Sequence, residues 1–260
     1  MEAAPLRIQQ KPHATRPPGS GPAERYDVRL AAGANDLVSA LRLRHEVFNV
    51  ELGSGSPAES NANLEFDAFD FKCRHLLVID RQTGETVGTY RLNSIESARD
   101  LDGFYSSGEF DLSSIPDDII EQGIEIGRAC VARSHRNSKV LFKLWQGLIS
   151  ELRRSGKRYY FGCCSIFTQD PSVGRDAYLW LANNGHVEQS YQVSPRRNAI
   201  DVDPSLSSPK IKLPDLFNMY LRLGAKVCGP PMIDTDFGTI DFFVVFDASL
   251  MSDKYRKLLG

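Results

Sequence analysis

The sequence predicts an α/β fold, a mixed β-sheet flanked by helices, and three observations support this prediction. Strand-sized apolar runs recur along the chain, at residues 74–80, 159–165 and 241–247. Residues 140–154 place apolar side chains at spacings of three and four, the period of a helix with one buried face. The signals follow the order strand, helix, hairpin, strand, helix, strand, helix, strand, which is typical of a sheet covered by helices.

The composition is that of an ordinary globular protein. The chain has 260 residues, of which 42% are hydrophobic and 25% charged, enough for one large domain or two small ones. Because no linker interrupts the middle, we expect a single domain at residues 25–260. Residues 1–24, rich in proline and scattered charges, are expected to be a disordered tail. The net charge of −2 gives no general reason to expect a nucleic-acid partner.

The cysteines and the hydropathy pattern point to the cytoplasm. The five cysteines show no CxxC spacing, which favours free thiols in a reducing compartment. Cys163 and Cys164, adjacent in an apolar strand, are more typical of core thiols than of a nucleophile. No apolar run is long enough to span a bilayer, so any membrane association is expected to be peripheral. The histidines lack metal-ligand spacing, and no metal site is expected.

The first half of the chain predicts a strand, a helix and a hairpin. Tyr26–Leu30 alternates as a strand does, and Asn35 is expected to cap a helix. The inward positions of that helix are Leu37, Leu41, Arg44, Phe48 and Leu52. Residues 53–57, GSGSP, resemble loops that close over a substrate. Arg74–Asp80 and residues 85–92 predict a hairpin.

Two arginines of this half have more than one interpretation. Arg44 lies on the apolar stripe of its helix, where a long side chain can extend along the edge, and the pattern alone favours this no less than a functional role. Glu65, Asp67 and Asp70 follow within reach, and they would supply the carboxylates that a guanidinium in an apolar setting needs. Arg91 ends a strand, where a surface position is the simplest interpretation.

The stretch Gly123–Val131 carries an acid, Glu125, and a base, Arg128, inside an otherwise apolar strand. Burying both is unfavourable unless they are paired or used. Strict alternation points them to opposite faces, because their separation is odd. A bulge at Gly127 would bring both to one face and would splay the next strand away, leaving a slot lined by unpaired backbone groups.

The second half of the chain alternates helices and strands. The expected elements are a helix at 140–154, a strand at 159–165, helices at 172–182 and 213–223, and a strand buried on both faces at 241–247. Gly224 is expected to stop the last of these helices. Residues 193–212, rich in proline and serine, predict an irregular excursion.

These residues form an ordered set that resembles a known enzyme family. Arg44 with Phe48, Asp67 with Asp70, Arg91 in GTYRL, and Glu125 with Arg128 look like the motif of acyl-homoserine lactone synthases, members of the GNAT N-acyltransferase superfamily. More closely, RHEVF, FYSSGEFDL, EIGRACV, FGCCS, YLRLGA and DFGTIDFFVVF resemble the ornithine-lipid biosynthesis enzymes that N-acylate ornithine from acyl carrier protein. The resemblance covers residues 28–246 and implies a GNAT fold with a splayed, bulged strand.

The resemblance also implies roles for individual residues. The implied catalytic set is Glu125, Arg128 and Arg91, and the implied substrate-binding set is Arg44, Phe48, Asp67 and Asp70. In this assignment Glu125 is the general base on the acceptor amine. The chemistry agrees, because an ammonium group must lose a proton before it attacks a thioester and a buried carboxylate can accept it. Free amides of a bulged strand would serve the oxyanion.

One departure from the superfamily concerns the acyl donor. Acetyl-CoA enzymes use a Q/R-x-x-G-x-G/A loop, but residues 136–141 of this chain, RNSKVL, contain no glycine. The following helix N-terminus still favours an anion, so we expect a phosphopantetheine phosphate delivered by an acidic acyl carrier protein. The expected carrier-binding residues are Arg133, Arg136, Asn137, Ser138 and Lys139. Acyl-phosphopantetheine is then a co-substrate, and no permanently bound cofactor is expected.

The expected function is therefore transfer of a long, 3-hydroxylated acyl chain from acyl carrier protein to the α-amine of an amino acid. Ornithine is the first choice, which makes the product lyso-ornithine lipid. Glycine or lysine as acceptor, a homoserine-lactone-type synthase, and a non-catalytic carrier-binding or lipid-binding module remain alternatives. The apolar product suggests a peripheral encounter with the cytoplasmic face of the inner membrane.

Overall fold

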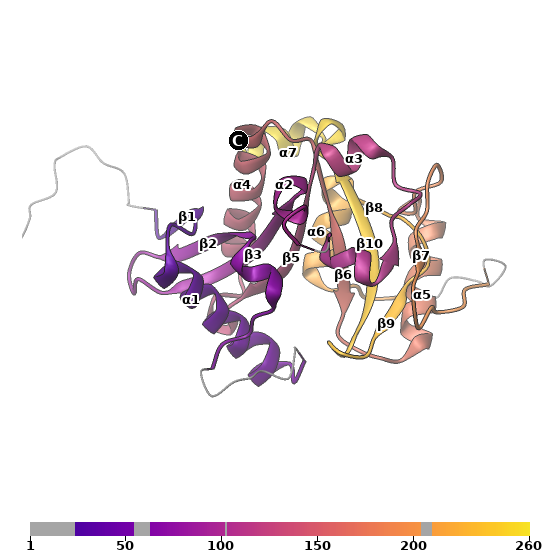
Figure 1. The fold of residues 1–260 in the computed structure, drawn as a ribbon, viewed down its shortest axis with the longest axis horizontal. Coiled ribbons are helices and arrows are strands. Elements are labelled where there is room, and N and C mark those ends of the chain that lie inside the picture. Colours follow the sequence, from indigo (N-terminus) through magenta and orange to yellow (C-terminus); the bar gives the residue numbers. More distant parts are fainter. Residues whose placement is uncertain (1–23, 55–62, 102, 204–209) are drawn as a thin grey trace, which may run out of the picture.

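The computed structural model describes residues 24–54, 63–101, 103–203 and 210–260 (Figure 1). Its strands are β1 Tyr26–Leu30, β2 Arg74–Asp80, β3 Thr86–Ser94, β4 Phe110–Asp111, β5 Gly123–Val131, β6 Tyr159–Ile166, β7 Ser194–Pro195, β8 Lys226–Val227, β9 Met232–Asp234 and β10 Thr239–Asp247. Its α-helices are α1 Ala34–Arg44, α2 Ile95–Ala98, α3 Asp117–Glu121, α4 Ser138–Ser155, α5 Pro171–Asn183, α6 Asp215–Leu223 and α7 Asp253–Leu258. Shorter or irregular helical segments are η1 His45–Glu51, η2 Ala68–Phe71, η3 Tyr105–Gly108, η4 Arg133–His135 and η5 Ala248–Leu250.

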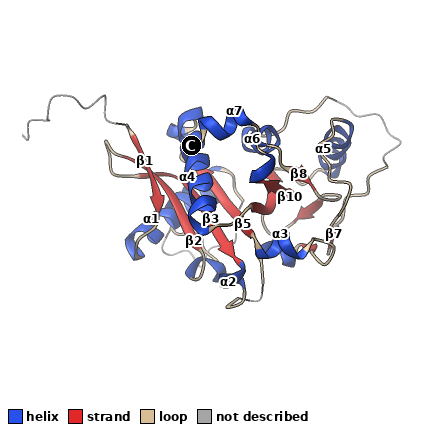
Figure 2. Ribbon diagram, turned by 90° about the horizontal axis from the view of Figure 1, so that it is seen from above, coloured by secondary structure: helices blue, strands red, loops and turns tan. Residues whose placement is uncertain are grey.

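A large mixed sheet with helices on both sides confirms the predicted fold class. The strands lie in the order β1-β2-β3-β5-β6-β10-β8, and β9 pairs with β10. The β5–β6 pair is parallel, whereas the other pairs of this sheet are antiparallel. Helices α6 and α7 lie on one side of the sheet, and α2 and α3 lie on the other (Figure 2). Residues 1–23 of the predicted tail, and residues 55–57 of the predicted closing loop, lie outside the described residues.

Helix α4 packs over strands β1, β2 and β3. Its apolar stripe, predicted from the spacing, is buried in the main core. A Cβ at Gly147 would lie 2.6 Å from Cγ2 of Val28 and 2.9 Å from the methyl groups of Leu76. This glycine therefore lets the helix approach the sheet closely.

Helix α1 lies against the face of β3 that carries Arg91. Gly33 is its N-cap residue, not Asn35 as predicted, and the helix continues into the π-helical segment η1. The predicted inward stripe is retained across this change of helix type, since Arg44 and Phe48 are both buried. An arginine therefore does stand on the buried side of the helix.

Strand β10 separates two apolar cores, which confirms that it is buried on both faces. Phe242 and Val244 pack in the core shared with α4 and α6, whereas Phe243 and Val245 belong to a second core around Phe110. The sequence predicted only a loop in the region of this second core, yet α2, η3, β4 and α3 all form there.

The remaining predicted elements are close to their expected positions. The helices expected at 172–182 and 213–223 form as α5 and α6, and α6 ends at Gly224 in the left-handed conformation. The excursion at 193–212 contains the short strand β7, and its residues 204–209 lie outside the described part. All five cysteines are free. Within the described residues, no helix combines the length and apolar character needed to cross a bilayer.

Candidate active site

Strands β5 and β6 pair over three residues only. Their ladder runs from Gly123 opposite Tyr159 to Glu125 opposite Phe161, after which the strands separate. A Cβ on Gly162, where φ is 146°, would lie 2.4 Å from the carbonyl oxygen of Ile126, so this point requires glycine. Further along, β5 stays paired with β3 and β6 stays paired with β10. The result is a slot between β5 and β6.

The bulge in β5 lies at Arg128, and the prediction of a bulge at Gly127 is wrong. Thr89 of β3 pairs with Cys130, but Arg91 pairs with Gly127. Two residues of β5, Arg128 and Ala129, therefore lie opposite one residue of β3, Tyr90. Arg128 has a φ of 48°, in the left-handed region. That conformation costs a non-glycine residue about 1 to 3 kcal/mol, so the surrounding contacts must hold it.

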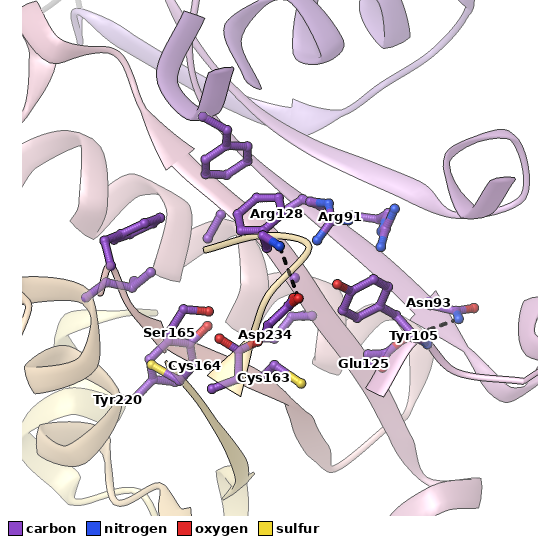
Figure 3. Close-up of a pocket in the computed structure, with 18 residues that line it drawn as sticks. Arg91, Asn93, Tyr105, Glu125, Arg128, Cys163, Cys164, Ser165, Tyr220 and Asp234 are labelled. Carbon is purple, nitrogen blue, oxygen red and sulfur yellow. Dashed lines mark hydrogen bonds between the residues drawn. The ribbon is translucent and has the colours of Figure 1, made fainter. Parts of the chain in front are cut away.

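A pocket of about 100 Å³ occupies the slot (Figure 3). Its polar lining residues are Arg91, Asn93, Tyr105, Glu125, Arg128, Ser165, Tyr220, Asp234 and Asp241. All three residues predicted as catalytic, Glu125, Arg128 and Arg91, line it. Of the predicted substrate-binding set, Phe48 lines the pocket, whereas Arg44, Asp67 and Asp70 lie behind its wall.

A network of buried ion pairs stands behind this wall. It joins three arginines, Arg44, Arg91 and Arg128, to three carboxylates, Glu65, Asp67 and Asp70. Arg44 is fully buried and pairs with Glu65 and Asp70, its Nη2 donating to Oδ2 of Asp70 at 3.0 Å. Burial alone would raise the pKa of Asp70, but Arg44 and Arg91 hold it well below its usual range. The acidic partners predicted for Arg44 are therefore confirmed.

The network reaches the pocket through Arg91 and Arg128, which share Asp67. Nη1 of Arg91 donates to Oδ1 of Asp67 at 2.5 Å, and Nη2 of Arg128 donates to Oδ2 at 3.1 Å. The guanidinium of Arg128 lies between two rings, with centroids at 4.6 Å for Tyr105 and 4.7 Å for Phe237. Stacking of this kind, together with the ion pairs, holds the strained bulge in place.

Glu125 is buried and its carboxylate accepts four hydrogen bonds. The donors are the backbone amides of Tyr105 at 3.0 Å and Ser106 at 2.8 Å, the Ser106 hydroxyl, and the side-chain amide of Asn93 at 3.4 Å. These bonds stabilise the carboxylate and hold η3 against β5. Within the described residues no ion pair joins Glu125 to Arg128, although both line the same pocket (Figure 3).

A second group of buried carboxylates lies at the same pocket. Its members are Glu109, Asp234 and Asp241, each 1 to 3% exposed. Oε2 of Glu109 accepts from the Cys163 thiol at 2.9 Å, and Asp241 accepts from the Thr239 hydroxyl at 2.7 Å. Unlike the first group, none of the three is ion-paired with a cationic side chain of the described residues.

Because these carboxyl groups are buried without an ion-paired cation among the described residues, the pKa values of two of them, Glu109 and Asp241, are raised. Burial, with Asp241 and Asp234 nearby, raises the pKa of Glu109 to about 8. Burial also raises the pKa of Asp241. Burial, followed by Glu109 and Asp241, raises the pKa of the Cys163 thiol well above its usual value. Cys163 is therefore a thiol at neutral pH, in agreement with the prediction that it is not a nucleophile.

The predicted carrier-binding residues lie beyond the slot, around the start of α4. All five are exposed and none lines the pocket: Arg133, Arg136, Asn137, Ser138 and Lys139. Oδ1 of Asn137 accepts from the amides of Lys139 at 3.0 Å and Val140 at 3.3 Å. It thus occupies two helix N-terminal donors that a phosphate would otherwise use. Arg136 is also engaged, in a bidentate ion pair with Glu51.

Sequence reasoning missed half of the polar site. The residues not predicted are Asn93, Tyr105, Ser106, Glu109, Ser165, Tyr220, Asp234 and Asp241. Two of them carried a usable signal, because Asp241 is a charge in the apolar run DFFVVFD and Glu109 is the acid of FYSSGEFDL. Asn93 and Asp234 had none, since Asn93 is the last residue but one of β3 and Asp234 ends β9, where polar residues are common.

Comparison with known proteins gives the family. Residues 43–146 match the family model described as an acetyltransferase (GNAT) domain. The chain is 32% identical over 251 residues to an L-ornithine N(alpha)-acyltransferase of Brucella abortus, covering 90% of this chain and 88% of that protein. It is 29% identical over 247 residues to the same enzyme of Rhodobacter capsulatus, covering 89% and 93%.

Among solved structures, the fold is similar to that of FeeM, an N-acyl amino acid synthase from uncultured soil microbes. The TM-score is 0.52 at 9% identity, and the match covers 87% of this chain and 94% of that one. The likeness at this identity concerns the fold alone. The chain belongs to the family of the L-ornithine N(alpha)-acyltransferases and is an N-acyltransferase of the GNAT fold.

Proposed function

We propose that this enzyme transfers a long 3-hydroxyacyl chain from acyl carrier protein to the α-amine of L-ornithine, forming lyso-ornithine lipid. Relatives named for N(alpha)-acylation of ornithine match the chain over close to their full length, which supports the acceptor. The structural observation that supports the reaction is the slot between β5 and β6, with the Glu125 carboxylate on its wall.

The reaction forms a C–N bond and breaks a C–S bond. The α-ammonium first loses a proton, which in this proposal passes to Glu125 directly or through a water molecule. The amine then attacks the thioester carbonyl. Backbone N–H groups of β5 at residues 126–131, which have no strand partner on the β6 side within the described residues, would donate to the oxyanion. The phosphopantetheine sulfur leaves as a thiol, with a proton given up by the attacking nitrogen.

The arginine and carboxylate network would act by positioning these groups. Arg128 stacks on Tyr105, and the Tyr105 amide donates to Glu125. A change in the network is therefore transmitted to the carboxylate without any contact to substrate. Arg44, Asp67 and Asp70 lie behind the wall, so we propose that they support the site and that Phe48 contacts the substrate.

The role of Glu125 is tested with Glu125→Gln, which keeps the size of the side chain and removes its charge. We expect kcat to fall about 100-fold or more, the usual contribution of a general base. Ser106→Ala is the matched control, because it removes one donor to the same carboxylate and leaves the charge; its kcat should fall less than about tenfold. Circular dichroism checks that both variants fold. A folded Glu125→Gln enzyme with wild-type kcat would contradict the assignment.

The acyl donor is tested by comparing carrier-protein and coenzyme A thioesters of the same chain, with product measured by mass spectrometry. Arg133 and Lys139 are exposed basic residues that form no ion pair within the described residues, which favours docking of an acidic carrier there. In Arg133→Glu/Lys139→Glu, we expect KM for the carrier thioester to rise at least about tenfold. Arg153→Glu, exposed at the other end of α4, is the control. A preference of the wild type for coenzyme A thioesters would overturn the carrier proposal.

Contact with the cytoplasmic face of the membrane is a further part of the proposal, because the product is a lipid. Val50 of η1 and Phe71 of η2 are large apolar side chains with 71% and 66% exposure. Cosedimentation with anionic vesicles should be weaker for Val50→Ser/Phe71→Ser than for wild type. Leu258→Ser on α7, also an exposed apolar position, is the control. Equal sedimentation of all three proteins would contradict this part.

A further inference from the structure

The pocket has an acidic side built from three separate segments. Glu109 follows η3, Asp234 ends β9, and Asp241 lies on β10 opposite Ser165 of β6. Asp234 and Asp241 line the pocket together with Glu125, and Figure 3 labels Asp234 and Glu125 among the lining residues. One cavity therefore connects the proposed base to this acidic side.

Glu109 has an unfilled position for a hydrogen-bond donor. Its side chain is buried, Oε2 accepts from the Cys163 thiol, and no donor is assigned to Oε1. Side-chain hydrogen bonding with Tyr105 and with Asp241 also acts on the pKa values of the two carboxyl groups, so a proton shared by Glu109 and Asp241 can fill this position until a ligand enters. One ligand atom each from Glu109, Cys163 and Asp241 lies within 4.8 Å of the others, so the Glu109 carboxyl belongs to the acidic group. A buried acceptor without a donor is unfavourable, and a bound group with N–H donors would satisfy it.

The acidic group also lacks positive charge. The network behind the other wall balances three carboxylates with three arginines, whereas no lysine, arginine or histidine of the described residues is ion-paired with the acidic group. Buried carboxylates are stable as anions only when a cation accompanies them. We infer that Glu109, Asp234 and Asp241 form a subsite for the side-chain ammonium of the acceptor, which selects diamino acids over neutral amino acids.

The inference rests on the proposed function, because it places the second amine of ornithine. An alkylammonium carries three N–H donors and no acceptor, which suits a site made of acceptors. The α-amine would then lie on the Glu125 side and the side-chain ammonium on the acidic side. Glu109 holds a proton at neutral pH in the absence of ligand, since burial and its acidic neighbours raise its pKa to about 8. Entry of the ammonium would displace that proton.

The test compares L-ornithine with L-norvaline, which has the same carbon chain and no side-chain amine. We expect wild-type kcat/KM to favour ornithine by at least roughly 100-fold, because a site built to bind a polar group rejects an analogue that lacks it. Asp241→Asn and Glu109→Gln should raise KM for ornithine at least about tenfold and leave norvaline within about twofold. Asp236→Asn, an exposed acid near Asp234, is the matched control and should leave the ratio unchanged. An equal loss for both substrates in the two variants would overturn the inference.

Binding without an acyl donor separates this inference from the proposed function. Calorimetry should show ornithine binding to wild type, proton release in buffers of different ionisation enthalpy, and loss of both in Asp241→Asn. If wild type acylates no ornithine but this binding is observed, the proposed function fails and the subsite stands. If ornithine and norvaline bind equally, the subsite fails even when ornithine is acylated. Stoichiometric Zn²⁺ binding that Asp241→Asn abolishes and that excludes ornithine would assign the group to a metal and overturn the inference.

Thermal unfolding supplies a readout that a purely structural role would not give. If the three carboxylates exist for binding, removing one charge should raise the Tm of the ligand-free protein at about pH 9, above the pKa of about 8 of Glu109, while weakening ornithine binding. A lower Tm in both Asp241→Asn and Glu109→Gln, with ornithine binding unchanged, would show that the acidic group only supports the fold.

Discussion

Two groups of carboxylates, one behind the pocket wall and one at the pocket, differ in their partners. Glu65, Asp67 and Asp70 lie against three arginines and carry no net charge as a network. Glu109, Asp234 and Asp241 lie against a thiol, a hydroxyl and backbone amides. The first group is complete without a ligand and holds the wall in shape. The second is incomplete, and a cationic ligand would complete it.

The largest difference is expected when a cation is removed from the complete group. Arg44→Ala removes the cation that Glu65 and Asp70 share and leaves them only their longer contacts to Arg128 and Arg91, which should lower the free energy of unfolding by about 3 to 5 kcal/mol. Urea denaturation measures this. Arg42→Ala, an exposed arginine of the same helix, should change stability by less than about 0.5 kcal/mol. Similar values for the two variants would show that the network contributes no more than a surface charge.

The incomplete group is expected to make stability depend on pH in the opposite sense from an ion-paired acid. The folded-state pKa of Glu109, about 8, lies above its unfolded value, so the folded protein keeps a proton that the unfolded chain releases. The contribution of Glu109 to stability is therefore full below about pH 4.5 and is lost as pH rises toward 8, by on the order of 4 kcal/mol. Between pH 5 and 8 the free energy of unfolding of wild type should fall relative to Glu109→Gln. Parallel profiles would mean that Glu109 is already ionised at neutral pH.

The bulge depends on the shape of the guanidinium as well as on its charge. Arg128→Lys keeps the charge but loses the planar stacking between Tyr105 and Phe237 and one of the two ion-pair contacts. We expect a loss of about 2 kcal/mol and a lower kcat, because Tyr105 positions Glu125. Wild-type activity in this variant would show that the bulge does not need a planar guanidinium stacked between the two rings.

The smallest effect is expected from a single donor of the incomplete group. Thr239→Val keeps the shape of the side chain and removes the hydroxyl that donates to Asp241. Stability should fall by about 1 kcal/mol at pH 8 and by less at pH 5, where protonation of the carboxyl groups reduces the need for a donor. Urea denaturation at the two pH values measures this difference. An equal loss at both would indicate an effect of packing alone.

Features with a local pattern were predicted well. The alternation of strands and helices, the buried stripe of α4, the double burial of β10 and the end of α6 at Gly224 follow from spacing and from the conformations that glycine allows. The acids that pair with Arg44 were also predicted, because they lie within about one loop of it in the sequence.

Features that depend on pairing between distant segments were not predicted correctly. The sequence placed the bulge at Gly127 because glycine tolerates unusual backbone conformations, but the register with β3 decides which residue is extra, and that residue is Arg128. In the same way, Asn137, predicted as a carrier-binding residue, caps α4, a role that was not predicted for it from the sequence. The residue type limits where a bulge or a helix cap can form, while the pairing with a neighbouring strand or helix determines the position.

By itself, the sequence determined the fold class, the order of elements and the strand that carries Glu125 and Arg128. Each of these follows from apolar residues that repeat every two positions in strands or every three to four positions in helices. Only the tertiary structure decided which carboxylates have partners. The acidic group joins residues 109, 234 and 241 from segments whose side chains meet across β6, β9 and β10. The spacing of residues along the chain does not predict this contact, because burial, charge and hydrogen bonding at a site depend on neighbours that are distant in the sequence.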